Sequence, residues 1–125
     1  MISILVIDDD QDFNNIVTSF LSEQGYRVAS AFNGKEGIAR FEDDLPDIVI
    51  TDIRMPKKDG VDLLLKFRNH PDHQPRGIIL MSGLSNSDNQ TYQAMLKSLG
   101  AHDYLQKPFE LKDLLVKIET IMRQS

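Results

Sequence analysis

Six polar residues of this sequence stand at the ends of short apolar runs, and their side chains are carboxylates, one hydroxyl and one ammonium group. They are Asp8, Asp9, Asp10, Asp52, Ser82 and Lys107. If the apolar runs are parallel strands of one sheet, their carboxyl ends lie along the same edge, where ligands bind in folds of this kind. The sequence therefore predicts that these side chains gather at one edge of the fold.

A cluster of carboxylates of this kind needs positive charge. Two carboxylates about 4 Å apart repel by about 4 kcal/mol at an effective dielectric of about 20, so the acids must take up protons or bind a cation. Oxygen ligands without histidine or cysteine favour a hard ion, and we expect Mg²⁺, with Mn²⁺ as an alternative. The ion and Lys107 would leave a positive pocket for a phosphoryl group. Asp52 is the carboxylate best placed to be its nucleophile, because aspartyl phosphate is a recognised covalent intermediate.

Strand-like and helix-like patterns alternate along the whole chain. Runs of aliphatic and β-branched residues predict five strands, over residues 4–7, 26–31, 48–50, 78–81 and 104–106. Apolar residues at helical spacing predict five helices, over residues 13–21, 34–41, 61–68, 94–99 and 111–122. Asn33 followed by Glu36 predicts a capping box, and Gly25 and Gly100 predict helix ends. The fold class is therefore α/β: one doubly wound domain over residues 1–125, with a mostly parallel sheet covered on both faces.

The composition narrows the class of protein. The 125 residues are 41% hydrophobic and 26% charged, which suits one soluble domain with a single core region. The net charge of −5 has the wrong sign for direct nucleic-acid binding. The absence of cysteine excludes disulfides and thiolate metal sites, and no apolar run is long enough to cross a membrane. We therefore expect a cytoplasmic protein.

Four motifs occur along the chain in a fixed order. They are Ile4-Leu5-Val6-Ile7-Asp8-Asp9, then Asp52-Ile53-Arg54-Met55-Pro56 with Asp59-Gly60, then Ser82-Gly83, and finally Lys107-Pro108-Phe109. Together they resemble the receiver domain of bacterial response regulators, the CheY-like family, over essentially the whole chain. The resemblance implies a flavodoxin-like fold with five parallel strands in the order 2-1-3-4-5 and five helices.

The resemblance also implies a role for each residue of the cluster. Asp52 accepts a phosphoryl group from a phosphohistidine on a sensor histidine kinase or a histidine phosphotransfer protein. Asp9 holds Mg²⁺ directly and Asp8 largely through water, while Asp52 and the backbone carbonyl of Arg54 complete the protein ligands. Lys107 pairs with a phosphoryl oxygen. The domain would assist only its own phosphorylation and dephosphorylation, so we do not expect an enzyme.

Switching is implied in the same way. Ser82 donates to a phosphoryl oxygen and moves toward it, and Tyr104 swings into the space that Ser82 leaves. This would reshape the face formed by the fourth helix, fifth strand and fifth helix. A downstream effector protein would bind this face in trans. The receiver would be a monomer or a phosphorylation-dependent dimer. The family commonly has a cis bond at the position of Lys107-Pro108.

The sequence departs from the family pattern in three places. Asp10 adds a third consecutive acid, which we expect near the metal but not bound to it. Ser82 and Lys107 lie 25 positions apart, a few more than usual, and the excess falls on residues 84–90. Arg54 and Leu84 lie where the family tunes the lifetime of the phosphoryl group.

Two other functions are compatible with parts of the pattern. Asp8 and Asp10 also match the start of haloacid-dehalogenase-type phosphatases, as nucleophile and acid/base, although Gln11 and Asp12 follow where that family has glycine and threonine or valine. A receiver-shaped scaffold that binds partners without being phosphorylated is the second alternative.

Several of these residues also have simpler structural explanations. Asp8 and Asp9 are acids before a helix and are suited to capping it, and Ser82 is a common residue type at turns. Tyr104 is an ordinary half-buried strand residue. His70 and His73 do not predict a zinc site, because the prolines around them break any helix that would align them.

Overall fold

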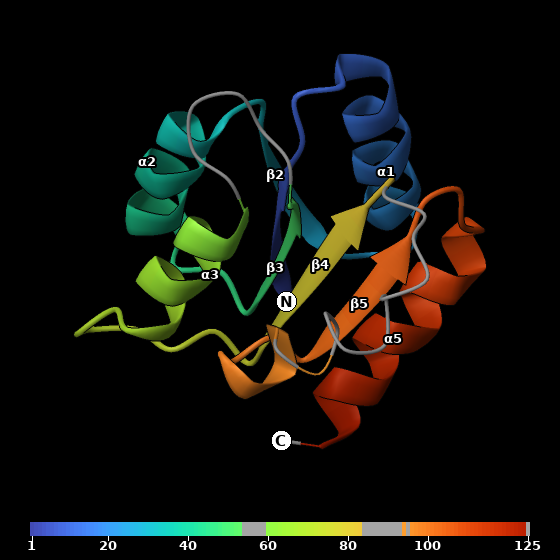
Figure 1. Cartoon of the computed structure of the whole chain (residues 1–125). Helices are drawn as coiled ribbons and strands as arrows, with labels where there is room; N and C mark the ends of the chain where they lie inside the picture. Colours follow the sequence, from blue (N-terminus) through green and yellow to red (C-terminus); the bar gives the residue numbers. More distant parts are fainter. Residues whose placement is uncertain (54–59, 84–93, 95, 125) are drawn as a thin grey trace.

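The computed structural model describes residues 1–53, 60–83, 94 and 96–124, which form one five-stranded parallel sheet with helices packed on both faces (Figure 1). The elements are β1 (Ser3–Ile7), α1 (Gln11–Glu23), β2 (Arg27–Ala31), α2 (Gly34–Asp44), β3 (Ile48–Asp52), α3 (Gly60–Arg68), β4 (Gly77–Ser82), β5 (Asp103–Gln106) and α5 (Leu111–Arg123). The sheet order is β2-β1-β3-β4-β5, and each pair of neighbours is parallel. The predicted α/β class and the strand order 2-1-3-4-5 are confirmed.

Four of the five predicted helices lie within the described residues. At the position of the other, residues 94 and 96–98 are described and are helical. Residues 84–90, where the extra length between Ser82 and Lys107 is predicted to fall, lie outside the described part of the chain.

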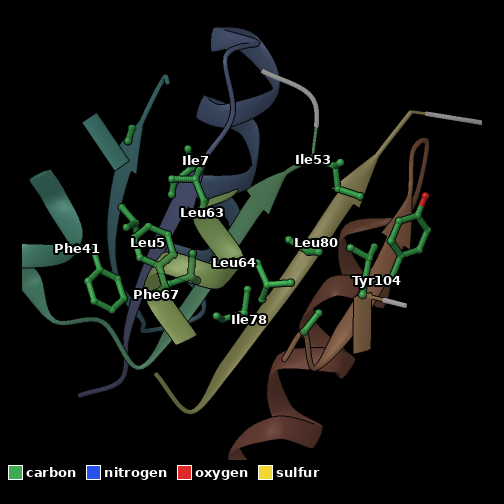
Figure 2. Packing of buried hydrophobic residues seen from close by; sticks show 14 residues of the cluster. Leu5, Ile7, Phe41, Ile53, Leu63, Leu64, Phe67, Ile78, Leu80 and Tyr104 are labelled. Atoms are coloured by element: carbon green, nitrogen blue, oxygen red, sulfur yellow. The ribbon is translucent and has the colours of Figure 1, made fainter. Parts of the chain in front are cut away.

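The three central strands are buried on both faces, which explains why their sequences are continuous apolar runs. In β1, Leu5 and Ile7 point into one core, and Ile4 and Val6 point into the other. Helices α2 and α3 cover the first core, shown in Figure 2, whereas α1 and α5 cover the second. The sheet is thus held between two apolar layers, and the carboxyl ends of its parallel strands lie along one edge.

The first core contains an aromatic stack that joins two helices. The rings of Phe41 on α2 and Phe67 on α3 are nearly parallel, with centroids 4.3 Å apart, and each residue is 1% exposed (Figure 2). His70 and His73 pack against Phe41. The Nδ1 atom of His70 accepts hydrogen bonds from backbone N–H groups, and its Nε2 lies 3.1 Å from Glu42, so this ring has a structural role.

The helix boundaries follow the predicted signals. The Asn33 side chain accepts a hydrogen bond from the Glu36 backbone N–H, as predicted, and the Glu36 carboxylate accepts one from the backbone N–H of Phe32, one residue before the N-cap that a regular capping box would use. Gly25 and Gly100 have φ values of 95° and 116°, which favour glycine after a helix. None of the described helices has both the length and the apolar character needed to cross a membrane.

Candidate functional site

The predicted site residues lie at the carboxyl ends of four strands. Asp8 follows β1, Asp52 ends β3, Ser82 ends β4, and Lys107 follows β5. The parallel register brings these ends level, because Asp52 is paired with Met81 and Ser82 with its β5 neighbour Gln106. One sheet edge therefore collects side chains from the first, middle and last parts of the sequence.

Three acids converge at this edge. Asp8, Asp9 and Asp52 each place a carboxylate oxygen within 4.8 Å of the other two. Asp8 is fully buried, Asp52 is 9% exposed, and Asp9 is exposed. Oxygen donors of this kind match a hard divalent cation such as Mg²⁺, which tolerates few protein ligands and keeps several waters. The donor set thus fits the predicted metal.

Lys107 supplies positive charge to the same cluster. Its Nζ atom donates to Asp8 Oδ2 at 2.7 Å and to Asp52 Oδ2 at 3.0 Å. The Lys107-Pro108 peptide bond is cis, as the resemblance implied. The ammonium group therefore bridges the buried acid and the predicted phosphoacceptor.

The electrostatics of the cluster favour an additional cation. Burial raises the pKa of Asp8, and it outweighs the opposing hydrogen bonds from Lys107 and from the Asp10 backbone N–H. Burial alone would lower the pKa of Lys107, but its hydrogen bonds to Asp8 and Asp52 and the attraction of their negative charges together outweigh that effect and raise it. Lys107 thus stays charged, while the buried Asp8 carboxylate remains short of compensating charge. A divalent ion beside it would supply that charge.

Asp10 has a different role from its two neighbours. Its carboxylate accepts a hydrogen bond from the Phe13 backbone N–H at 3.1 Å and caps α1, and its own N–H donates to Asp8 Oδ1 at 3.0 Å. Among the described acids, it is not one of the three that converge. Asp10 thus caps α1 beside the three predicted metal ligands, and its expected absence from the metal site stays a prediction.

Comparison with known proteins agrees with this geometry. The family described as "Response regulator receiver domain" matches residues 4–119. The chain belongs to the response regulator receiver family. It is 34% identical over 125 residues to the transcriptional regulatory protein CpxR of Klebsiella pneumoniae, covering all of this chain and 51% of that protein. It is 35% identical over 124 residues to the regulatory protein VanRB of Enterococcus faecalis, covering 99% of this chain and 54% of that protein.

Solved receiver structures superpose closely on this one. A response regulator receiver domain protein from Clostridium thermocellum has a TM-score of 0.86 and 29% identity, with 99% of this chain and 96% of that chain covered. The chemotaxis protein CheY4 of Vibrio cholerae has a TM-score of 0.85 and 25% identity, with 97% and 98% covered. The receiver spans about half the length of the curated relatives it matches. Receivers are signalling domains of two-component systems rather than conventional enzymes.

The two residues expected to switch this receiver are both buried. Ser82 is 1% exposed, and its backbone carbonyl accepts a hydrogen bond from the Lys107 N–H at 2.7 Å. Tyr104 is 7% exposed, and its ring belongs to the first core (Figure 2). Arg54, whose backbone carbonyl was expected to bind the metal, lies outside the described residues.

One further polar residue lies at this receiver's site and was not predicted from the sequence. Asn14 on α1 is fully buried, and its Nδ2 donates to the backbone carbonyls of Asp8 at 3.1 Å and Ala31 at 2.9 Å. It therefore links the ends of β1 and β2 beside the acids, while its Oδ1 atom has no partner among the described residues. The available signal was its position, because Asn14 shares the inward helix face with Val17 and Leu21.

Proposed function

We propose that this receiver is a phosphorylation-activated switch in which Asp52 accepts a phosphoryl group from a phosphohistidine. The donor would be a sensor histidine kinase or a histidine phosphotransfer protein in the cytoplasm. The observation that carries the proposal is the contact of one ammonium group, that of Lys107, with both Asp8 and Asp52 at the carboxyl edge of the sheet. Acids and a cation in this arrangement suit phosphoryl transfer, which depends mainly on positioning and on neutralising charge.

Each residue then has a defined task. A carboxylate oxygen of Asp52 attacks phosphorus, the phosphorus–nitrogen bond of the donor breaks, and the electron pair leaves on the imidazole. The Lys107 ammonium pairs with a phosphoryl oxygen, and the Ser82 hydroxyl donates to another. Asp8, Asp9 and Asp52 would hold Mg²⁺, with the Arg54 carbonyl as a further proposed ligand. When bound, the ion would neutralise negative charge on the phosphoryl oxygens and on the attacking carboxylate.

The signal would leave the site through Ser82 and Tyr104. Movement of the Ser82 side chain toward the phosphoryl group would open space for the Tyr104 ring, which lies on the neighbouring strand β5. The face formed by β5, α5 and the preceding helical segment (α4-β5-α5 in the family) would change shape and bind an effector in trans. Phosphorylation would have to shift the equilibrium almost completely from the inactive to the active conformation. Such a shift needs about 5.5 kcal/mol of differential stabilisation, which a few charge-assisted hydrogen bonds can supply.

The test is direct chemical labelling of Asp52. We expect incubation with acetyl phosphate and Mg²⁺ to add one phosphoryl group, seen by intact-mass spectrometry as an acid-stable, hydroxylamine-labile adduct. Asp52→Asn is expected to abolish it, because an amide is not a nucleophile for phosphorus. An adduct that persists in Asp52→Asn, or its absence with every phosphodonor tried, would contradict the proposal. Hydrolysis of a phosphomonoester that survives Asp52→Asn and is lost in Asp8→Asn would instead favour the phosphatase alternative.

A matched pair of variants tests whether Asp9, and not its neighbour Asp10, is a metal ligand. We expect Mg²⁺ to raise the melting temperature of the wild-type protein, because a ligand at a hundred times its dissociation constant stabilises the folded state by about 2.7 kcal/mol. Asp9→Asn should lose most of this shift, whereas Asp10→Asn should keep it, since asparagine also caps helices. Thermal melts followed by circular dichroism give the comparison. Equal losses in the two variants would argue against the assignment of Asp9.

A further inference from the structure

We propose that Phe13 is a positioning residue that holds the Lys107 ammonium group at the carboxylates through the face of its ring. This inference rests on the proposed function and assigns a role that neither the acids nor Lys107 can fill alone. The Lys107 Nζ atom lies over the Phe13 ring, 4.2 Å from its centroid. This distance is within the range of a cation–π attraction, which strengthens as the cation loses water.

The contacts of the ammonium group leave a place for the ring. A lysine ammonium has three N–H donors and no acceptor. The Lys107 ammonium donates hydrogen bonds to Asp8 at 2.7 Å and to Asp52 at 3.0 Å. The Phe13 ring then supplies a third contact, which attracts the cation without adding a negative charge. An aromatic ring therefore holds Lys107 without competing with a phosphoryl oxygen for it.

Phe13 is itself held by two contacts, one through its backbone and one through its ring. Its backbone N–H donates to the carboxylate of Asp10, which fixes the first turn of α1. Its ring packs nearly perpendicular to that of Phe109, with centroids 5.7 Å apart and an interplanar angle of 89°. Phe109 follows Lys107 closely in sequence, so the aromatic pair joins α1 directly to the segment that carries the ammonium group. The two rings thus fix the position of Lys107 relative to α1.

The enclosure of Lys107 gives this contact its functional consequence. The Lys107 side chain is only 20% exposed, although lysine side chains usually extend into water. When a phosphoryl group arrives on Asp52, the ammonium has to exchange a carboxylate oxygen for a phosphoryl oxygen. A ring that keeps Nζ within the site during this exchange shortens the search for the new partner. Phe13 would therefore act on the rate of transfer through Lys107, without touching the phosphoryl group.

The placement of Lys107 can be measured before any phosphorylation. Protons above an aromatic ring are shifted upfield in NMR spectra, so we expect the Hε protons of Lys107, assigned with Lys107→Met, to lie upfield of those of the other lysines. Phe13→Leu should remove this shift, and Phe13→Tyr, which keeps a ring, should retain it. Phe20→Leu is the matched control, because Phe20 is also a partly buried phenylalanine of α1 and packs in the second core.

The same variants test the consequence for transfer. With saturating acetyl phosphate and Mg²⁺, we expect Phe13→Leu to lower the maximal rate of adduct formation by about threefold to thirtyfold, the range that matches a cation–π contact. Phe13→Tyr should restore most of the rate, and Phe20→Leu should leave it unchanged. Absence of the upfield shift in the wild type, or a Phe13→Leu variant with the wild-type shift and rate, would overturn the positioning role. A wild-type protein that shows the shift but forms no adduct would instead overturn the proposed function and, with it, the catalytic purpose of this contact.

Discussion

Replacing Lys107 with methionine is expected to slow the phosphorylation of Asp52 by about a hundredfold or more. The ammonium group is the cation that contacts both Asp8 and Asp52, at 2.7 Å and 3.0 Å, so it is already positioned where charge develops during transfer. Loss of one such preorganised group typically costs about 10²–10³ in rate. Methionine keeps the apolar length of the side chain, so the variant removes mainly the charge. The measurement is the rate of adduct formation at saturating acetyl phosphate and Mg²⁺.

A second lysine provides the control for this experiment. Lys117 on α5 also makes an ion pair, with its Nζ atom 3.0 Å from Asp103 Oδ2, but both side chains are about 30% exposed and lie away from the acid cluster. Exposed ion pairs contribute little to stability. The Lys117→Met variant should therefore be phosphorylated at the wild-type rate. A Lys107→Met variant within threefold of wild type would show that the ammonium group is not part of the transfer chemistry.

Truncation of Phe67 to alanine is expected to lower the free energy of unfolding by about 3–5 kcal/mol, the usual range for a fully buried phenylalanine. Phe67 stacks on Phe41 at a centroid distance of 4.3 Å, and both rings are buried between α2 and α3 (Figure 2). The loss is large beside the 5–15 kcal/mol that usually stabilises a domain. Urea unfolding followed by circular dichroism measures it.

The control for this prediction keeps most of the apolar volume. Phe67→Leu removes the ring but leaves a large aliphatic side chain, so we expect a loss of about 1–1.5 kcal/mol, as for other substitutions that nearly conserve volume. If Phe67→Ala and Phe67→Leu were equally destabilising, the stacking geometry rather than buried volume would determine the stability of this core. A loss below about 1 kcal/mol in Phe67→Ala would mean that the cavity collapses and refills.

The central strands could be predicted from the sequence because burial on both faces leaves a simple pattern. Every residue of β3 and β4 is buried, so continuous apolar runs mark them directly. The edge strand β2 gives a weaker signal, since it has an exposed Arg27 and three partly buried residues. The positions of Asp8, Asp52, Ser82 and Lys107 followed from the same logic, because the residues at or just after the end of a parallel strand are known once the strand is found.

Residues whose role depends on contacts between distant elements could not be predicted in this way. Phe13 and Asn14 both lie within a helical pattern, where Phe13 is an ordinary apolar residue and Asn14 an apparent interruption. Their significance arises only when α1 packs beside β1 and the segment after β5. The ring contact of Phe13 with Lys107 joins residues from opposite ends of the chain, and helical periodicity carries no information about such a pairing.

Asp8 and Lys107 lie 99 positions apart in the chain, and this separation sets the order in which the site is completed during synthesis. Asp8 and Asp9 leave the ribosome early, and Lys107 follows only after all five strands have been made. Contacts this far apart in sequence form late, because closing a long loop is entropically costly before other strands have joined. The proposed chemistry therefore requires a nearly finished sheet. Newly made or partly folded molecules would therefore not be phosphorylated and would not signal.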